Sequence, residues 1–573
     1  MQILINHIGY ELAGPKQAVL VTQRAYLPHT HAELVSATDH QPVARLAIEA
    51  HGRVDQWHQG EFYRIDFSSL SQPGQYYLQF GDTRSACFTV AERLLLQKTL
   101  SDLLHYFKSQ RCSGEFDRQD RCVPLFEQSQ RVDVHGGWYD ASGDVSKYLS
   151  HLSYANFLNP QQIPMVVWNM LYGLEQSAHL LAPFTQQRLQ EEALYGVEFL
   201  LRMQHPSGYF YTTVFDGWSK QLDQRQICSY ATQQGKRSAD FQAGFRQGGG
   251  IAIAALAKAA GCQQLNHDTA ERYFQAAVLG YHHLLEHNHR YLDDGQPNII
   301  DEYCALLAAV ALYQTSQDLH WLIQSRDWAE RLIARQRSDD NFAHYWSAND
   351  SGSRPYYHAA EAGLPGLALC QYLAIETEPA KRQRAITALR QSCQFELQVT
   401  SRDVNPFGYP RQYVKPVDGP KQDSFFIPHH NESGYWWQGE NARLASLACM
   451  AYSAQPYLTD QQQTDMAGYA QNCLNWIVGL NPFDICMLDG HGRNNPDYLP
   501  ELGFFNAKGG ICNGITAGFD NQRDIAFNPE PHSDDMLQNW RWGEQWIPHG
   551  GWYLLAILLQ GQHASHNPSE ERR

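Results

Sequence analysis

The spacing of apolar residues changes abruptly at Ala91–Glu92, and this change constrains the fold more than any other feature of the chain. Before it, apolar and aromatic residues form short segments that partly alternate with polar ones and are separated by turn signals such as Gly14-Pro15 and Pro73-Gly74. The predicted strands are 3–5, 18–21, 62–67, 76–80 and 86–90. Such regular short strands predict an immunoglobulin-like β-sandwich over residues 1–91.

From residue 92 almost to the C-terminus, apolar residues recur at helical spacing, as Val167, Met170, Leu171 and Leu174 do. The pattern predicts helices over 92–109, 163–181, 185–204, 249–260, 265–287, 298–315, 319–336, 357–375, 380–399, 434–454, 460–479 and 549–561. Because these helices vary in length and have no fixed repeat, they favour a closed ring of helical hairpins over a regular solenoid. We therefore expect a second, helical domain over residues 92–573.

Four long segments between the predicted helices are rich in Gly, Pro, Asn, Asp and aromatic residues. They are residues 110–160, 205–248, 400–433 and 481–548. Loops of this length without regular structure are uncommon unless they are functional or disordered, and these are too aromatic for disorder. We expect them to carry the functional site at one end of the ring.

Composition excludes several classes of partner. The formal net charge is −16, from 44 Lys and Arg against 60 Asp and Glu, which argues against nucleic acid and anionic membranes as partners. No segment is apolar enough to span a membrane, and the start of the chain has no signal-peptide pattern, so we expect a cytoplasmic protein. Its 12 cysteines are then expected to be reduced. No Cys-x-x-Cys or His-Glu-x-x-His is present, so neither a zinc site nor a cofactor is predicted.

Two carboxylates lie four residues apart in the segment 135–148, at Asp140 and Asp144. Glycines around them allow tight turns that can direct both carboxylates into one space. The preceding Trp138 and Tyr139 add aromatic faces, and aromatic rings beside acids are the composition expected of a sugar site. The structural alternative is a surface turn in which Asp140 caps the next helix.

A third acid, Glu544, lies among Trp540, Trp542 and Trp546 just before the last predicted helix. Indole rings around a carboxyl group remove water from it and raise its pKa, as a general acid requires. Hydrolysis of a glycosidic bond usually uses two carboxyl groups, one as proton donor and one to activate water or attack carbon. The alternative is a helix N-terminal glutamate stabilised by the helix dipole.

Several motifs resemble those of glycoside hydrolase family 9. Gly137-Trp-Tyr-Asp-Ala-Ser-Gly-Asp144 is similar to its Trp-Tyr/His-Asp-Ala-Gly-Asp signature. Ile5-Asn-His-Ile-Gly-Tyr10 resembles the immunoglobulin-like domain that precedes many of its catalytic domains, and Gly479-Leu-Asn-Pro482 resembles its Gly-x-Asn-Pro motif. The resemblance covers nearly the whole chain. It implies an (α/α)6 barrel and hydrolysis with inversion of anomeric configuration.

By position, the resemblance implies that Asp144 is the catalytic base, that Asp140 helps to hold the nucleophilic water, and that Glu544 is the general acid. The family signature separates its aspartates by two residues, whereas three separate them here, so the base remains either Asp140 or Asp144. The loop 481–493 also lacks the Ser-Phe/Tyr-Val-Thr-Gly run and the His-His-Arg of the family's cellulases. Cellulose is therefore a less favoured substrate.

The Asp-Ala-Ser-Gly-Asp variant, in a chain without an export signal, most resembles the exo-β-D-glucosaminidases of the family. These enzymes release glucosamine from the non-reducing end of chitosan oligosaccharides, and the sugar's ammonium group would need a nearby carboxylate. The residues expected to bind substrate, some of them as that carboxylate, are Trp138, Tyr139, His358, Glu361, Trp436, Trp437, Glu440, Asp489, His491, Arg493 and Trp546.

Three alternatives to a glucosaminidase remain. A β-glucosidase or cellodextrinase of the same family would act on short cello-oligosaccharides. A non-catalytic oligosaccharide-binding protein would keep the tryptophans and tolerate loss of Glu544. A glycoside phosphorylase would need a basic phosphate pocket in place of the second carboxylate. In each case the partner is a small oligosaccharide, and the sequence does not predict the oligomeric state.

Overall fold

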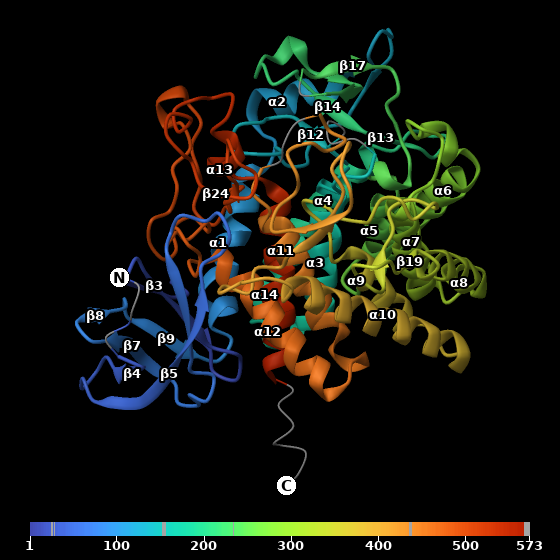
Figure 1. Cartoon of the computed structure of the whole chain (residues 1–573). Helices are drawn as coiled ribbons and strands as arrows, with labels where there is room; N and C mark the ends of the chain where they lie inside the picture. The colour runs from blue at the N-terminus through green and yellow to red at the C-terminus, as the bar shows by residue number, and fades with distance from the viewer. Residues whose placement is uncertain (25–26, 28, 152–155, 233, 435–437, 566–573) are drawn as a thin grey trace.

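A computed structural model describes residues 1–24, 27, 29–151, 156–232, 234–434 and 438–565. The first nine strands form a β-domain beside the helices, in blue at the lower left of Figure 1. These strands are β1 (Gln2–Leu4), β2 (Tyr10–Glu11), β3 (Gln17–Thr22), β4 (His31–Ser36), β5 (Pro42–Gly52), β6 (Glu61–Asp66), β7 (Gly74–Phe80), β8 (Thr83–Arg84) and β9 (Phe88–Ala91). The predicted order, a β-sandwich followed by a helical domain, is confirmed.

The two layers of the sandwich share the long strand β5. Its first half pairs with β4 and its second half with β6, so that the strand order is β1-β3-β6-β5-β4-β7-β9-β2, with β8 paired to β7. Alternating residues point into one apolar core, which includes Leu20, Leu34, Phe67 and Phe88. The predicted strands do not include β2, β4, β5 or β8. For β5 the reason is that most of its side chains are exposed or half-exposed, so it lacks an apolar pattern.

The helical domain is a double ring of helices. The inner helices are α3 (Ile163–Ser177), α5 (Gly249–Ala260), α7 (Ile299–Ser316), α9 (Leu364–Leu373), α11 (Asn441–Ala454) and α14 (Ile547–Ser565). The outer helices are α1 (Leu94–Gln110), α4 (Pro183–Arg202), α6 (His267–Tyr291), α8 (Leu319–Ile333), α10 (Pro379–Thr400) and α12 (Asp460–Ile477). Each inner helix packs against the next, and α14 packs against α3 to close the ring. This arrangement is the (α/α)6 barrel.

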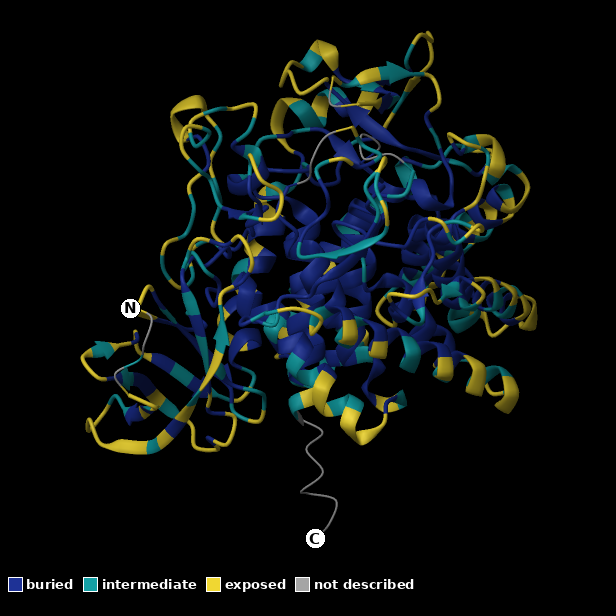
Figure 2. Ribbon diagram, viewed as in Figure 1, coloured by how far each residue is buried: buried dark blue, intermediate teal, exposed yellow. Residues whose placement is uncertain are grey.

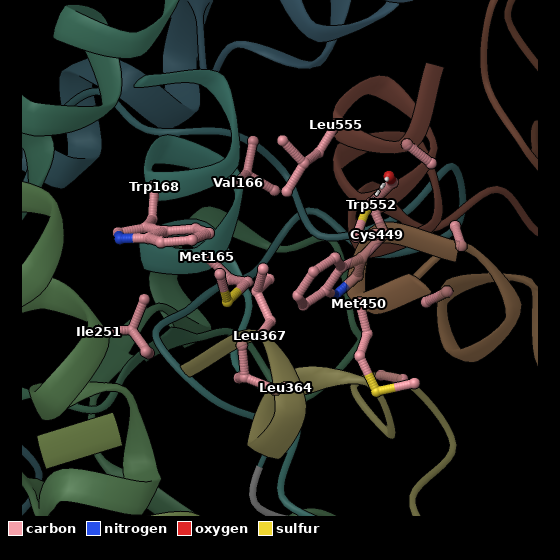
Figure 3. Packing of buried hydrophobic residues seen from close by; sticks show 14 of the residues in the cluster. Met165, Val166, Trp168, Ile251, Leu364, Leu367, Cys449, Met450, Trp552 and Leu555 are labelled. Carbon is pink, nitrogen blue, oxygen red and sulfur yellow. Dashed lines mark hydrogen bonds between the residues drawn. The ribbon is translucent and has the colours of Figure 1, made fainter. Parts of the chain in front are cut away.

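The inner helices are buried almost all round, as the dark blue centre of Figure 2 shows. Their sequences are apolar on every face, which is the pattern of a helix in the middle of a large core. Trp168 from α3, Ile251 from α5, Leu367 from α9, Met450 from α11 and Trp552 from α14 meet at the barrel centre (Figure 3). The N-termini of all six inner helices lie at one end of this core. The long loops that precede these helices in the chain cover that end.

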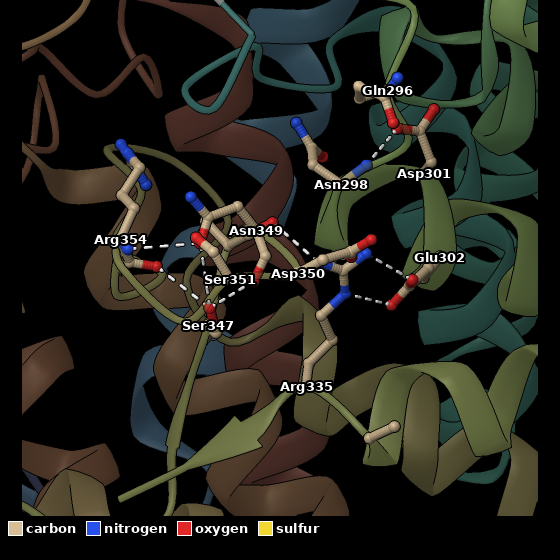
Figure 4. A network of polar contacts seen from close by, with 12 residues as sticks. Gln296, Asn298, Asp301, Glu302, Arg335, Ser347, Asn349, Asp350, Ser351 and Arg354 are labelled. Atoms are coloured by element: carbon tan, nitrogen blue, oxygen red, sulfur yellow. Dashed lines mark hydrogen bonds and ion pairs between the residues drawn. The ribbon is translucent and has the colours of Figure 1, made fainter. Parts of the chain in front are cut away.

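Ion pairs join this end of α7 to the loop that precedes α9 (Figure 4). The guanidinium of Arg335 donates to both carboxylate oxygens of Glu302, at 2.9 and 2.7 Å, and pairs with Asp350 at 2.7 Å. Asn298 caps α7 by accepting the N–H of Ile300 at 2.8 Å. Charged groups that are almost fully buried are therefore paired here, as burial of charge requires.

The twelve predicted helices correspond to the inner and outer rings, but α9 and α11 begin about seven residues later than predicted. Pro365 lies in the first turn of α9, where a proline fits best. Before α11, a Cβ on Gly439 would overlap the carbonyl of Asn513, so the backbone there passes too close to its neighbour to continue as helix.

Short elements build the loops at the site end of the barrel. The short helices are α2 (Gly114–Gln119) and α13 (Trp540–Gly543). The short strands are β10 (Val123–Pro124), β11 (Arg131–Val132), β12 (Lys147–Tyr148), β13 (Phe210–Tyr211), β14 (Thr213–Phe215), β15 (Gln226–Ile227), β16 (Ser229–Ala231), β17 (Lys236–Ser238), β18 (Gln242–Ala243), β19 (Gln336–Arg337), β20 (Tyr345–Trp346), β21 (Gln412–Val414), β22 (Gln422–Ser424), β23 (Thr516–Ala517) and β24 (Ile525–Ala526). Over the part of the chain that the structure describes, no helix is long and apolar enough to cross a lipid bilayer.

Candidate active site

The loop 140–144 is a tight turn that pairs with a segment about 400 residues later in the chain. The N–H of Ala141 and the N–H of Asp144 each donate to the other residue's carbonyl at 3.2 Å. Ser142 donates its backbone N–H to the carbonyl of Gln545 at 2.9 Å, and Ala141 bridges to Trp546. The turn therefore presents both aspartates beside Glu544.

The turn brings the carboxylates of Asp140 and Asp144 close together. Ligand atoms of these two residues and of His151 all lie within 4.8 Å of one another. One water molecule that accepts or donates two hydrogen bonds of ordinary length spans roughly that distance. The pair can therefore hold a water between its two carboxylates.

Asp140 is the more enclosed of the two aspartates, at 3% exposure. The indole N–H of Trp546 donates to both of its carboxylate oxygens, at 3.2 and 3.1 Å, and the side-chain amide of Gln162 donates to Oδ1. Burial raises the pKa of Asp140 well above its usual value, and the nearby charges of Asp144 and Glu544 raise it further.

Asp144 accepts three hydrogen bonds. The donors are the backbone N–H of Ser146 at 2.8 Å, the hydroxyl of Tyr148 at 2.7 Å and the indole N–H of Trp218 at 3.1 Å. Burial raises the pKa of Asp144 to about 6, with a further contribution from the charge on Asp216, while the hydrogen bonds oppose the rise. At neutral pH the Asp144 carboxyl group is mostly ionised.

Glu544 is held at the other side of the turn. Its Oε1 accepts the backbone N–H of Gly143 at 3.1 Å. Burial raises the pKa of Glu544 to about 8, and the charge on Asp144 contributes in the same direction. At neutral pH Glu544 therefore mostly keeps its proton and can donate it.

The three carboxyl groups line one cavity of about 300 Å³. Its lining residues are Asp140, Gly143, Asp144, His151, Trp218, Gln438, Tyr498, Phe504, Asn513, Met536, Leu537, Trp540, Glu544 and Trp546. Among these lining residues, the sequence pattern predicts five at or beside the site: Asp140, Asp144, Glu544, Trp540 and Trp546. The others come from four separate loops and have no local signal beyond aromatic character.

Trp138 and Tyr139, predicted to bind substrate, do not line the cavity. Trp138 is fully buried, and its indole N–H donates to Glu192 at 2.8 Å. The hydroxyl of Tyr139 is hydrogen-bonded to the backbone of Ser113, which turns the ring away from the aspartates. Both predictions are corrected. The backbone that points the Asp140 side chain into the cavity points the side chains of Trp138 and Tyr139 away from it.

His358 and Glu361 lie inside the barrel and have no exposed surface. Glu361 accepts the hydroxyl of Tyr303 at 2.5 Å and the backbone N–H of Gln161 at 2.8 Å. His358 Nδ1 accepts the backbone N–H groups of Ala360 and Glu361. Burial lowers the pKa of His358 to about 3 and raises that of Glu361 to about 8, so both are neutral at pH 7. His358 and Glu361 therefore hold the backbone just before α9 in place and do not contact a sugar.

Glu440 is likewise structural. Its carboxylate accepts the amide of Gln412 at 2.9 Å and the N–H of Ile427 at 3.0 Å, and it pairs with Arg443 at 3.1 Å. These bonds fix the loop before α11. Trp436 and Trp437, the other residues predicted in this segment, lie outside the described residues.

His491 and Arg493 lie where the β-domain meets the barrel, and not in the cavity. Arg493 pairs with Asp484 at 2.5 Å, and Asp484 is hydrogen-bonded to His7 of the β-domain at 2.9 Å. His491 pairs with Asp102 of α1 at 2.9 Å. The predicted sugar-binding role of both is corrected, because their side chains pair with Asp484 and Asp102 outside the cavity, and of these contacts only that between Asp484 and His7 reaches the β-domain.

Asp489 lies on the same loop as His491 and is also absent from the cavity lining. Its backbone N–H donates to the carbonyl of Gly510 at 2.9 Å, and its own carbonyl accepts the N–H of Gly509 at 3.0 Å. These bonds tie the loop to the segment that follows it. Asp489 is therefore not placed to bind the substrate's ammonium group.

Within the described residues, one group of His, Cys, Asp or Glu side chains is close enough to hold a metal ion, namely Asp140, Asp144 and His151. N–H and O–H donors already occupy both aspartates, from Trp546, Gln162, Tyr148 and Trp218 in the bonds above. Carboxylate oxygens that already accept hydrogen bonds have fewer lone pairs left, whether for a cation or for a further hydrogen bond.

The chain is similar to known proteins along almost its whole length. The family model described as glycosyl hydrolase family 9 matches residues 97–501, and that of the cellulase N-terminal ig-like domain matches residues 1–85. No curated protein sequence matches significantly.

Solved structures share the fold at low sequence identity. A metagenome-derived glycoside hydrolase family 9 endoglucanase is 19% identical with a TM-score of 0.68, covering 98% of this chain and 99% of that one. A family 9 protein of Bacteroides ovatus is 16% identical (TM-score 0.65, coverage 98% and 99%). A mutant of a thermostable endoglucanase from Alicyclobacillus acidocaldarius is 17% identical (TM-score 0.65, coverage 97% and 99%).

Proposed function

This chain belongs to glycosyl hydrolase family 9, with the family's N-terminal immunoglobulin-like domain, and we propose that it is an inverting exo-β-D-glucosaminidase. It would release glucosamine from the non-reducing end of short chitosan oligosaccharides. The observation that carries the proposal is the group of three carboxyl groups, Asp140, Asp144 and Glu544, around one small cavity.

The proposed chemistry is a single displacement. Asp144, ionised near neutral pH, takes a proton from a water that it holds together with Asp140, and the water oxygen attacks the anomeric carbon. The bond from that carbon to the glycosidic oxygen breaks, and the oxygen takes the proton of Glu544. Attack from the face opposite the leaving group converts a β-glycoside into the α-anomer. Asp144 then releases its proton to solvent, and Glu544 takes one up, so that both groups return to their starting states.

Asp144 is favoured over Asp140 as the base. Its pKa is raised only to about 6, whereas Asp140 is more deeply buried, beside two other acids, and has its pKa raised well above the usual value. A base must be ionised to accept a proton, and Asp144 is the aspartate that ionises first. Asp140 then orients the water.

The acidic floor of the cavity supports an amino sugar as substrate. Asp140 and Asp144 line it, and Asp216 lies close behind, where its charge affects Asp144. An ammonium group at C2 would gain a charge-assisted hydrogen bond from such a floor. The cavity volume of about 300 Å³ is at the lower end for ligand pockets, which suits removal of one terminal sugar.

A second candidate is hydrolysis of short cello-oligosaccharides. Lys220 lies close enough to Glu544 and Asp144 for its charge to interact with both, and it would repel a cationic substrate. Two of the three similar structures named above are endoglucanases, although at 17–19% identity they are evidence of fold alone.

An NMR time course separates these candidates. The protein is incubated with glucosamine disaccharide or with cellobiose at equal concentration, each with and without phosphate. We expect faster cleavage of the glucosamine disaccharide, first appearance of the α-anomer and no phosphate consumption. Faster cleavage of cellobiose would favour the second candidate, and phosphate consumption would indicate a phosphorylase.

Glu544→Gln is the matched control for this experiment. The amide keeps the shape of the side chain but has no proton to donate to the glycosidic oxygen. We expect loss of turnover with an unchanged melting profile. Near-normal activity would contradict the assignment of the general acid.

A further inference from the structure

The cavity has two chemically different sides. The turn 140–144 supplies the acidic floor, and Tyr498, Phe504, Met536, Leu537 and Trp540 supply a mainly apolar part of the lining. Tyr498 places this part next to Glu544, because a Cβ on Gly143 would meet both Oε1 of Glu544 and the hydroxyl of Tyr498. Four of these five side chains carry no hydroxyl or charged group. The substrate atoms that leave the cavity on this side therefore meet a mainly apolar surface.

This apolar surface belongs to two loops, 495–506 and 528–540, which lie at the upper left of the barrel near α13 and β24 in Figure 1. Leu537 is 73% exposed and Met536 48% exposed, and Leu502 and Phe505 on the other loop are 56% and 67% exposed. Figure 2 shows the exposed tips of loops in this region in yellow. Clustered exposure of large apolar side chains marks a binding surface more often than chance exposure does.

A hydrogen bond holds loop 495–506 against the segment just before Glu544, and contacts within each loop fix its shape. Asn506 donates its side-chain amide to the carbonyl of Gly543 at 2.9 Å. The indole N–H of Trp540 donates to the carbonyl of Leu537 at 2.9 Å, and Tyr498 packs on Phe504 with ring centroids 5.4 Å apart. The apolar surface is thus fixed beside the group that protonates the leaving oxygen.

A cation also lies on this side. The ammonium of Lys220 is 3.9 Å from the centroid of the Phe504 ring. A second cation in contact with the Phe504 ring would lie close to Lys220 and be repelled by it. An uncharged apolar group would instead contact the Phe504 ring and the side chains of Met536 and Leu537 without repulsion from Lys220.

From these observations we infer that the leaving-group site, defined by Tyr498, Phe504, Met536, Leu537 and Trp540, binds an uncharged apolar aglycone, as in an alkyl or aryl β-glycoside. The inference rests on the proposed function only for the position of Glu544 next to the leaving oxygen. The sugar remains in the acidic floor, and the apolar group extends over the two loops.

A series of methyl, propyl and butyl β-glucosaminides tests the inference, because the alkyl alcohols leave with similar acidity. Each glycoside is titrated into the Glu544→Gln protein by calorimetry, so that binding is measured without turnover. A fully buried methylene changes a binding constant about fourfold, and a half-exposed one about twofold. We expect the butyl glycoside to bind about eightfold more tightly than the methyl glycoside. Binding that is independent of chain length would overturn the inference.

A double variant, Met536→Ser with Leu537→Ser in the Glu544→Gln protein, tests whether these two side chains cause the dependence of binding on alkyl chain length. We expect it to lose most of the chain-length dependence while still binding the methyl glycoside. The matched control is Leu319→Ser with Ile323→Ser on α8, two aliphatic side chains that are 66% and 54% exposed but far from the cavity. The control should keep the full dependence, and equal loss in both variants would contradict the assignment.

Turnover by the wild-type protein separates this inference from the proposed function. If butyl glycosides bind as expected but no glycoside is hydrolysed, the proposed function fails and the apolar site stands. If glucosamine disaccharide is hydrolysed and KM does not fall along the alkyl series, the proposed function stands and the inference fails.

Discussion

Gly143 shows how strongly a single residue is constrained at the site. A Cβ built at this position would overlap Oε1 of Glu544 and lie 3.0 Å from the hydroxyl of Tyr498. Its backbone N–H is at the same time a hydrogen-bond donor to Glu544. The additional residue between the two aspartates is thus accommodated by a turn in which a glycine touches the third acid.

We predict that Gly143→Ala lowers kcat at least about 100-fold, since an error of about 1 Å in a catalytic group costs that much. The added methyl displaces Glu544 from the leaving oxygen. Measured kcat and melting temperature check this, with Gly468→Ala as the control. Gly468 lies in α12 with nothing within 4 Å of an added Cβ, so that variant should keep full activity.

The pH dependence of activity follows from the pKa values of Asp144 and Glu544, about 6 and about 8. Asp144 must be ionised, so activity falls below about pH 6, and Glu544 must be protonated, so activity falls above about pH 8. We predict a bell-shaped profile of kcat/KM between these limits.

Asp216→Asn should move the acidic limb of that profile to lower pH. The negative charge of Asp216 raises the pKa of Asp144, and its removal makes ionisation of Asp144 easier. Asparagine keeps an oxygen that can accept from Ser146 and Trp218, the partners of Oδ1. An unchanged acidic limb would show that another group titrates there.

At the scale of the element, every inner helix begins at the site end of the barrel, and the loops before α3, α5, α11 and α14 contribute to the cavity. His151 lies before α3, Trp218 before α5, Gln438 before α11, and Glu544 and Trp546 before α14. The barrel itself supplies a rigid base through close packing. Gly196 of α4 is one such contact, because a Cβ there would overlap Trp138 and Val167.

Gly196→Ala should therefore destabilise the protein by about 1–3 kcal/mol, as overpacking of a core does. Chemical denaturation measures this, again against Gly468→Ala, in which the same helical change meets open space. Stability equal to that of Gly468→Ala would mean that α4 can shift without cost.

The helices could be predicted from sequence because their apolar spacing is local, and the three acids because motifs mark them. The rest of the cavity could not. Trp218, Tyr498 and Leu537 meet through the packing of loops that are far apart in the chain. Motifs also do not distinguish a ring beside a sugar from one in the core, which is why Trp138 and Glu440 were misplaced.

At the scale of the whole molecule, the β-domain is fixed to the barrel by polar and aromatic contacts. Asn6 donates to Asn475 at 2.9 Å, and Trp57 packs on Phe425 with ring centroids 4.9 Å apart. The hydrogen bond between Asp484 and His7 crosses the same interface, and the ion pair of Asp484 with Arg493 lies beside it.

Asp484→Asn should weaken this interface and lower the free energy of unfolding by about 2 kcal/mol, because Arg493 loses its partner in a half-buried place. KM should not change, since Arg493 does not line the cavity. Denaturation and steady-state kinetics check both statements, with the exposed Asp82→Asn on the β-domain as the control. A rise in KM without loss of stability would restore a sugar-binding role for Arg493.

The closure of the ring by α14 against α3 also has a consequence for the order of biosynthesis. Asp140 and Asp144 are made about 400 residues before Glu544 and α14, so a ribosome must synthesise the helices between them before all three acids can meet. A nascent chain that stops before α14 would contain both aspartates but lack Glu544, and the proposed chemistry could not proceed in it.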